Sequence, residues 1–329
     1  MVVRDAPTAA ERPSHDAVPV LRAPDAVPPV DDHVFLLGRP TLRQFVAFVH
    51  DVSIHGQRAE SRALAHQWRT VRDEWARRAR NEAGAADGVT VLPLPDELEP
   101  LREGCLAQPL LRHAFDTVPV DVGWVELDRL VVYQKHIDLA YVARVRDRLG
   151  DAPSREHVFR TCLSYETAPP PLRAMRTRDN TYVIVSPSND LRALGGSVLE
   201  PQQIHDHHPP GVLGALVGVG IGFGSNLLTA VQAEGRLVLC NGSHRAYALR
   251  QMGHTHAPCL IQQVQNRDEL LSVASSDLRR DPDAYLRHPR PPLLRDYFDD
   301  RLCRLIPCVR RVRQVRIRFD VEEVDVPAV

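Results

Sequence analysis

Residues 226–264 constrain the fold of this chain more than any other stretch, because they carry four structural signals in a fixed order. Two apolar runs are joined at Glu234-Gly235, where glycine supplies the positive φ that a tight hairpin turn needs. The polar sequence NGSHR (241–245) follows, and then the helical pattern AYALRQMG, closed by Gly253. A further apolar run, APCLIQQV, predicts another strand. The stretch therefore predicts a β-hairpin, a polar loop, a short helix and a strand in succession.

The loop 241–245 has residue types suited to binding a phosphate group. We expect the following helix to begin at Arg245 or Ala246, so that its first free N–H groups and the positive end of its dipole face the loop. Gly242 permits a close approach of the backbone. Ser243, His244 and Arg245 can each hydrogen-bond to an anion, and the guanidinium group does so as a planar fork. A solvated, capped turn has the same composition, so the loop alone does not separate the two interpretations.

The surrounding pattern resembles the ParB/sulfiredoxin superfamily, in which a Gly-X-(His/Arg)-Arg loop joins a strand to a helix. Gly242-Ser243-His244-Arg245 is similar to the Gly-Cys-His-Arg loop of sulfiredoxins, with serine at the position of the reacting thiol. Upstream, VELDRLVVYQKHIDLAYVARVRDRLG resembles the opening strand, extended segment and helix of the family. The resemblance covers about 121–150 and 225–265, so that 151–224 would be an insertion.

The resemblance implies a bound nucleotide (ATP, ADP or CTP) with Mg²⁺, its phosphates resting on the loop. The residues expected to contact the nucleotide are Asn241, Gly242, Ser243, His244 and Arg245. Serine in place of the reacting cysteine excludes sulfinic acid reduction, since a hydroxyl group cannot replace the thiol in that chemistry. The function that this resemblance implies is a phosphotransferase or nucleotide hydrolase acting on a small hydroxyl-bearing molecule.

The candidate catalytic residues lie in the loop and in the segment YQKHID. Free-serine kinases of the superfamily use a carboxylate on this opening segment as a base. The nearest acids here are Glu126, Asp128 and Asp138, and His136 is an alternative because its ordinary pKa is near neutrality. Lys135, the only lysine of the chain, could steady a transferring phosphoryl group. The candidate catalytic residues are therefore Lys135, His136, Asp138 and Ser243. The alternative interpretation of Lys135 and His136 is that they lie on an exposed edge strand and have no catalytic role.

The chain as a whole predicts an α+β (mixed α/β) fold. We expect a disordered tail over 1–32, rich in Pro, Ala, Asp and Val, and a helical N-terminal region over 33–118 with apolar residues at helical spacing. A ParB/sulfiredoxin-like domain follows over 119–290. The last unit, 291–329, is predicted as a helix in RDYFDDRLCRLI followed by the alternating strand RQVRIRFDV.

The amino-acid composition limits the classes of partner and the cellular environment that we expect for this chain. Forty-one basic and 42 acidic residues leave a net charge of -1, which disfavours nucleic acid as the main partner. Six scattered cysteines indicate buried thiols in a reducing, cytoplasmic protein. The uncharged stretch 211–231 is long enough to span a bilayer, but its many glycines predict a buried strand and loop instead. His205, Asp206, His207 and His208 match no zinc spacing, so no metal site is predicted.

Two alternatives remain open. One is a ParB-like nucleotide-gated binding module, or a DNA-associated protein, without transfer chemistry. The other is an accessory protein that keeps the fold and has lost the ligand. The helical N-terminal region would serve either as a lid or as the contact of a possible homodimer.

Overall fold

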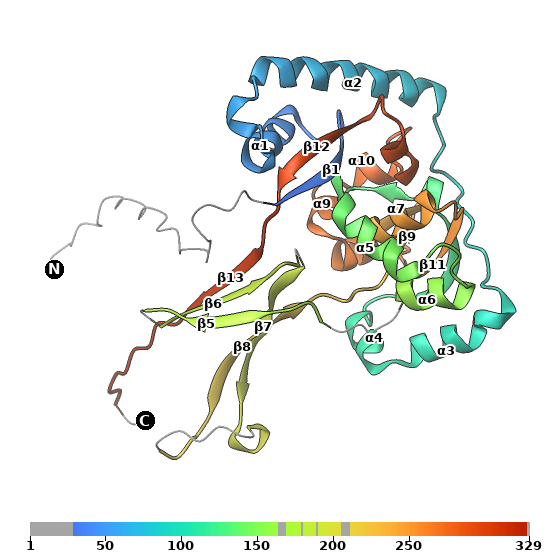
Figure 1. Cartoon of the computed structure of the whole chain (residues 1–329). Coiled ribbons are helices and arrows are strands. Elements are labelled where there is room, and N and C mark those ends of the chain that lie inside the picture. The colour runs from blue at the N-terminus through green and yellow to red at the C-terminus, as the bar shows by residue number, and fades with distance from the viewer. Residues whose placement is uncertain (1–28, 164–168, 179, 189, 205–210, 328–329) are drawn as a thin grey trace, which may run out of the picture.

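The computed structural model describes residues 29–327 except 164–168, 179, 189 and 205–210, and it is a mixed α+β protein, as predicted (Figure 1). Its centre is a five-stranded sheet of order β2-β11-β9-β10-β3. The strands are β2 (Val120–Glu126), β3 (Val131–Val132), β9 (Thr229–Ala233), β10 (Arg236–Asn241) and β11 (His256–Gln263). The β9–β10 hairpin turns at Glu234-Gly235, both with positive φ, which confirms the predicted turn.

Both faces of this sheet are covered. Leu237 and Leu239 of β10 belong to one core, whereas Val238 between them belongs to another, as the alternation of a strand requires. The larger core receives α5 (Leu139–Leu149), α6 (Arg155–Leu163) and α7 (Ser243–Gln251). The smaller core receives α8 (Arg267–Val273), α9 (Ser276–Arg280) and α10 (Pro282–Leu286).

The N-terminal region contains the predicted helices but begins with a strand. The helices are α1 (Leu42–Val52), α2 (Ser61–Asn81), α3 (Glu99–Ala107) and α4 (Pro109–Ala114). They are preceded by β1 (Val30–Leu36), so the expected tail boundary at residue 32 falls inside a strand. The reason is a long-range partner, since β1 lies between β12 (Cys303–Val309) and β4 (His136–Asp138) in a second sheet.

The C-terminal unit differs from its prediction in the same way. The helix expected in RDYFDDRLCRLI is only the 3₁₀ turn Leu294–Phe298, and the chain then enters β12. Antiparallel pairing from Val30↔Val309 to Leu36↔Cys303 outweighs the local helical pattern. The following strand β13 (Arg313–Arg318) is confirmed, with its alternating, half-exposed side chains.

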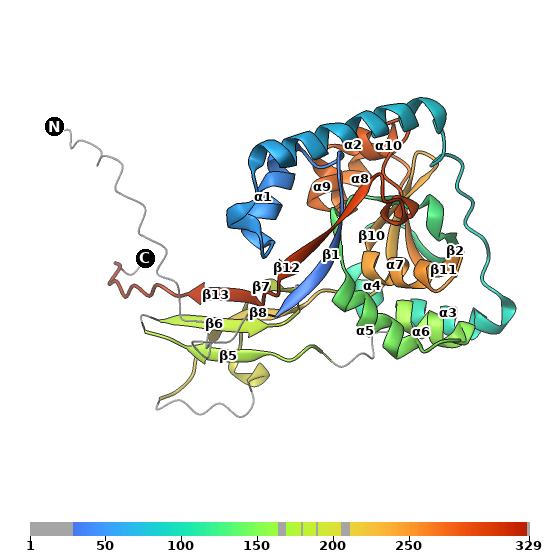
Figure 2. The same cartoon turned by 45° about the horizontal axis from the view of Figure 1, so that its top comes forward.

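The predicted insertion divides in two: α6 packs on the body, and the strands β5 to β8 (within residues 173–223) form an arm that extends away from it, seen best by comparing Figures 1 and 2. In this arm β5 (Arg173–Arg176) and β6 (Thr181–Ser186) pair with β13. The strands β7 (Leu191–Leu199) and β8 (Leu216–Phe223) form a separate hairpin. The prediction of a buried strand within 211–231 is wrong for β8, which lies in this two-stranded hairpin with Val217 68% exposed. It is correct at the end of the stretch, where Thr229, Ala230 and Val231 are buried in β9.

No helix in the described part of the chain is both long and apolar enough to cross a membrane. The six cysteines are free thiols, and five of them are buried, as predicted from their scatter.

Candidate functional site

The loop NGSHR lies where strand β10 passes into helix α7. Strand β10 ends at Asn241, Gly242 takes the left-handed conformation (φ 90°, ψ 18°), and α7 begins at Ser243. A Cβ atom at position 242 would lie 3.0 Å from Cα of Leu228, so both the backbone angle and the packing require glycine here. The helix therefore starts two residues earlier than the earlier of the two predicted starts, and the polar residues of the motif form its first turn.

This first turn leaves its amides free. The first intrahelical hydrogen bond runs from Ala246 N to Gly242 O at 2.9 Å, and no side chain caps the helix. Within the described part of the chain, the backbone N–H groups of Ser243, His244 and Arg245 have no hydrogen-bond acceptor. Uncapped N–H groups at the positive end of a helix dipole favour an anion.

Asn241 organises the turn from the strand side. Its Oδ1 accepts a hydrogen bond from Gly242 N at 2.8 Å, and its Nδ2 donates to Ser225 O at 2.7 Å. Both polar ends of this exposed side chain are therefore used to hold the loop. Asn241 fixes the geometry of the loop, whereas the free backbone amides of Ser243, His244 and Arg245 remain available to a ligand.

His244 carries a buried nitrogen without a partner. Among the described residues, its Nε2 has no hydrogen bond, and its ring lies 5.0 Å from that of Tyr141. Burial lowers the pKa of His244 to about 4; the nearby carboxylate of Asp138 opposes this shift. The imidazole is consequently neutral at pH 7, with an unsatisfied ring nitrogen in the first turn of α7.

Arg245 points away from the loop and into the protein. It is 2% exposed, and its Nη1 donates to the carbonyl oxygens of Thr161 (3.2 Å), Cys162 (3.1 Å) and Asn226. Thr161 and Cys162 lie in the last turn of α6, where carbonyl groups lack intrahelical partners and a cation is favourable. Burial lowers the pKa of Arg245. The Arg245 side chain thus joins α6 to α7, and we leave this side chain, though not the backbone amide, out of the phosphate site for which the sequence suggested it.

The segment YQKHID does meet the loop, through Asp138. Its Oδ1 accepts hydrogen bonds from Ala140 N (2.8 Å) and Tyr141 N (3.2 Å), so that Asp138 caps α5 as predicted. Helices α5 and α7 pack against each other, and β4 also contacts α7. Asp138 is the strongest electrostatic influence on His244, and its Oδ2 accepts no hydrogen bond within the described chain. The structure therefore brings Asp138, Ser243 and His244 to one end of the sheet.

His136 lies in an aromatic cluster. Its ring lies 4.8 Å from Phe48 and stacks on Phe35 at 6.4 Å, while its Nδ1 is 3.0 Å from Nδ1 of His33. Burial, and then the neighbouring His33, lower the pKa of His136 to about 3. Such an imidazole is a weak base, and the nitrogen on the side of His33 is already engaged.

His33 is a member of this region that the sequence analysis missed. It lies on β1, opposite Asp138 of β4, and burial lowers its pKa as well. No local pattern marks it, because only the pairing of β1 with β4 brings it here. A strand prediction for VDDHVFL would have been needed to find it.

Lys135 belongs to a different cavity. Its Nζ lies 4.0 Å from Oδ2 of Asp277, and it lines a cavity of about 330 Å³ that contains none of residues 241–245. The structure thus does not group Lys135 with the other predicted catalytic residues.

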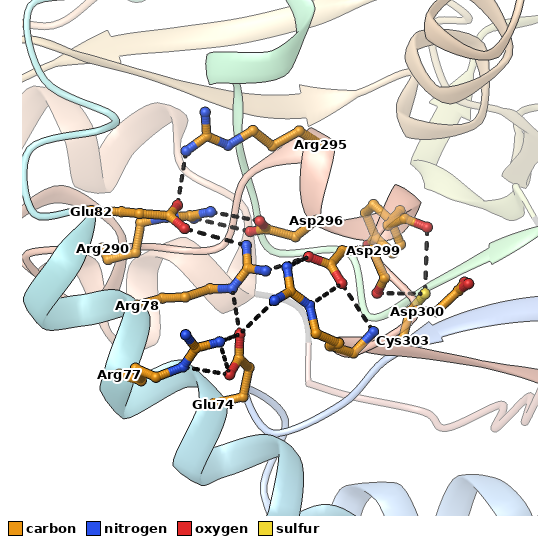
Figure 3. A network of polar contacts seen from close by, with 12 residues as sticks. Glu74, Arg77, Arg78, Glu82, Arg290, Arg295, Asp296, Asp299, Asp300 and Cys303 are labelled. Atoms are coloured by element: carbon orange, nitrogen blue, oxygen red, sulfur yellow. Dashed lines mark hydrogen bonds and ion pairs between the residues drawn. The ribbon is translucent and has the colours of Figure 1, made fainter.

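A larger, charged cleft of about 750 Å³ lies between the end of α2 and the segment 295–301, which includes part of the 3₁₀ turn Leu294–Phe298 (Figure 3). Each arginine lining it is paired with a carboxylate; the pairs are Arg78–Asp299, Arg250–Asp128, Arg295–Glu82 and Arg301–Asp299. The hydrogen bond from Arg301, with the help of Arg78, holds the pKa of Asp299 far below its ordinary value. With its cations already neutralised, this cleft is a junction between elements rather than an anion site.

Within the described ranges, no cluster of three or more His, Cys, Asp and Glu side chains could hold a metal ion. His205, Asp206, His207 and His208, for which the sequence predicted no metal site, lie outside the described residues.

Searches of protein-family models, of curated proteins and of solved structures found no significant match to this chain.

Proposed function

We propose that this protein is a nucleotide-binding enzyme of ParB/sulfiredoxin-like fold, a phosphotransferase or nucleotide hydrolase acting on a small hydroxyl-bearing molecule. The observation that carries the proposal is the uncapped first turn of α7, where three free amides adjoin a neutral histidine with an unsatisfied Nε2. An anion with several acceptor oxygens would satisfy these donors together. The order of hairpin, left-handed glycine, helix and strand around the turn is the one that suggested the family.

In this proposal the phosphates rest on the amides of Ser243, His244 and Arg245. The Ser243 hydroxyl group, which has no hydrogen-bond partner among the described residues, and His244 Nε2 add further hydrogen bonds. Magnesium would accompany the nucleotide, held mainly by phosphate oxygens and water, a coordination that Mg²⁺ commonly uses. It therefore does not require a cage of protein ligands, and it would neutralise charge that develops on the transferred group.

Asp138 is the residue that we propose as proton acceptor for the substrate hydroxyl group. One of its carboxylate oxygens caps α5, which fixes the side chain, while Oδ2 accepts no hydrogen bond from the described residues. Asp138 also acts electrostatically on His244 of α7. His136 is the weaker candidate, since its pKa of about 3 leaves little basicity and its Nδ1 is already engaged with His33.

Binding is tested by thermal unfolding and calorimetry with ATP, ADP, CTP and GTP in the presence of Mg²⁺, using Ser243→Glu with Ser243→Ala as its control. A glutamate in the first helical turn interacts favourably with the dipole, by about 0.5 kcal/mol, but repels a phosphate at the same place. We expect a nucleotide to stabilise the wild type and Ser243→Ala, and to have at least about tenfold lower affinity for Ser243→Glu. Equal affinity in all three proteins, or no stabilisation of the wild type by any nucleotide, would refute the proposal.

Catalysis is tested with Asp138→Asn. Asparagine caps a helix about as well as aspartate, so the fold and nucleotide binding should survive while the base is lost. We expect release of ADP or phosphate, measured with a panel of hydroxyl compounds and with water alone, to fall by about 10²-fold or more. Nucleotide binding by the wild type without turnover on any acceptor would instead favour the nucleotide-gated binding module.

A further inference from the structure

The cavity that contains Lys135 has features of a second binding site. It encloses about 330 Å³ between the segment from Leu36 to Gln44 and helices α9 and α10. This volume is near the lower end of the range for small-molecule sites, roughly 300–1,000 Å³. The aromatic side chains of Tyr133 and Tyr285, at 6.3 Å in an edge-to-face arrangement, form part of its wall.

Arg39 presents to this cavity a guanidinium group that forms no ion pair with any carboxylate among the described residues. Its Nη1 lies 3.4 Å from Nε2 of His288, its Nη2 donates to Ala284 O at 3.2 Å, and its Cζ lies 5.6 Å from the centre of the Trp75 ring. Among the described residues, no Asp or Glu oxygen lies within 4 Å of it. Burial, the largest influence, lowers the pKa of Arg39, which reflects a charge held in a poorly solvated place.

The other charged groups leave the cavity with an excess of positive charge. Lys135 and Arg280 share a single partner, Asp277, at 4.0 and 3.4 Å. Asp281 also lines the cavity but caps α10. Three cations therefore face two carboxylates, and the longest of these contacts is the one made by Lys135. The charged cleft near α2 differs, because there every arginine has a carboxylate within hydrogen-bond range, and its five carboxylates outnumber its four arginines.

We propose that this cavity binds a small molecule through a carboxylate or phosphate group, with Arg39 as the principal contact and Lys135 as the second. A bidentate anion would give Arg39 the counter-charge that it lacks. The two tyrosines would cover an apolar part of the same molecule. This site is independent of the proposed nucleotide site, since neither the first turn of α7 nor Asp138 lines it.

The single lysine of the chain makes the proposal directly testable. Lys135 is partly exposed, with 35% of its side chain accessible, and it is the only side-chain amine available to an acetylating reagent. Its acetylation rate is measured by mass spectrometry of the peptide that contains it, with increasing inorganic phosphate or succinate against chloride at equal ionic strength. An anion beside the ammonium group blocks the reagent and holds the amine protonated, so we expect acetylation to slow by about tenfold, with saturation.

Matched variants show whether the protection of Lys135 arises in this cavity. Arg39→Met keeps an apolar stem over Trp75 and should abolish the protection, whereas Arg43→Met removes an equally charged but exposed side chain and should retain it. Ser243→Glu should also retain the protection, which separates this site from the α7 turn. Protection of the wild type no greater than that given by chloride would overturn the proposal, even if Arg39→Met failed to fold. Protection that persists in folded Arg39→Met would overturn it as well.

Discussion

At the scale of single residues, four neighbours in one motif have different surroundings. Gly242 allows the turn, Ser243 is half-exposed, His244 packs on Tyr141 and Arg245 is buried beneath α6. Successive helical residues rotate by about 100°, so the start of the helix decides which side chain points where. The sequence identified the motif correctly as the junction of strand and helix. The sequence could not predict the direction of the Arg245 side chain. The predicted start of α7 was two residues too late, which put Arg245 in the loop rather than in the first turn of the helix.

The histidines near the site predict a dependence of stability on pH. In the folded protein the pKa values of His136 and His244 are about 3 and about 4, below the ordinary value of 6.5. The unfolded chain therefore binds protons that the folded chain does not, and stability is lost as the pH falls below about 6.5. At pH 5 each histidine should cost about 2 kcal/mol of the free energy of unfolding.

Urea unfolding at pH 7.5 and pH 5.0 measures this loss. We expect His136→Phe, which keeps an aromatic ring beside Phe35 and Phe48, to reduce the difference between the two pH values by about 2 kcal/mol. His66→Gln, at an exposed position of α2, should leave the difference unchanged. A wild-type stability that is the same at both pH values would contradict the buried, neutral state of these histidines.

At the scale of elements, local patterns predicted the structure well where neighbours in sequence also pair in space. The β9–β10 hairpin, α5 with its Asp138 cap and Gly150 stop, and β11 are observed where the sequence placed them. Two of the failures are β1 and β12, which pair with each other across more than 250 residues of the chain. Neither the tail-like composition before β1 nor the helical spacing before β12 contains information on that pairing.

The junction of α2 with the C-terminal segment gives a prediction for a buried ion pair (Figure 3). Arg290, fully buried, donates to both carboxylate oxygens of Asp296 at 2.6 and 3.0 Å and to Glu82, the residue directly after α2, at 2.9 Å. Asp296 also accepts a hydrogen bond from Leu293 N at 2.7 Å. Arg290→Met would leave a buried carboxylate without its cation, so we expect a loss of about 3–5 kcal/mol of the free energy of unfolding.

A double-mutant cycle tests whether the lost stability comes from leaving the buried Asp296 carboxylate unpaired. Arg290→Met combined with Asp296→Asn removes the charge while the amide oxygen can still accept from Leu293 N. We expect the double variant to be more stable than Arg290→Met alone, measured by urea unfolding of all four proteins. Strictly additive losses would show that the two side chains do not act as a pair.

At the scale of the whole molecule, the chain does not divide at the boundaries that composition suggested. Strands from the N-terminal region, the middle and the C-terminal unit share one sheet, β12-β1-β4, and β13 completes the sheet of the arm. The candidate site depends on this assembly, since Asp138 and His136 lie on β4 at the edge of that sheet, while Ser243 and His244 lie on α7 at the end of the other. Sequence reasoning could name these residues from a resemblance, but only the assembled sheets show which of them meet.

The most direct test of the central claim is a nucleotide titration followed by the backbone amide resonances of deuterated, ¹⁵N-labelled protein. The account predicts that the largest shifts on adding the nucleotide with Mg²⁺ occur at the amides of Ser243, His244 and Arg245, because these free N–H groups would donate to the phosphates. The same titration of Ser243→Glu should leave the amides of His244 and Arg245 almost unmoved. Large shifts confined to other parts of the protein, or none at any nucleotide concentration, would contradict a phosphate site at the start of α7.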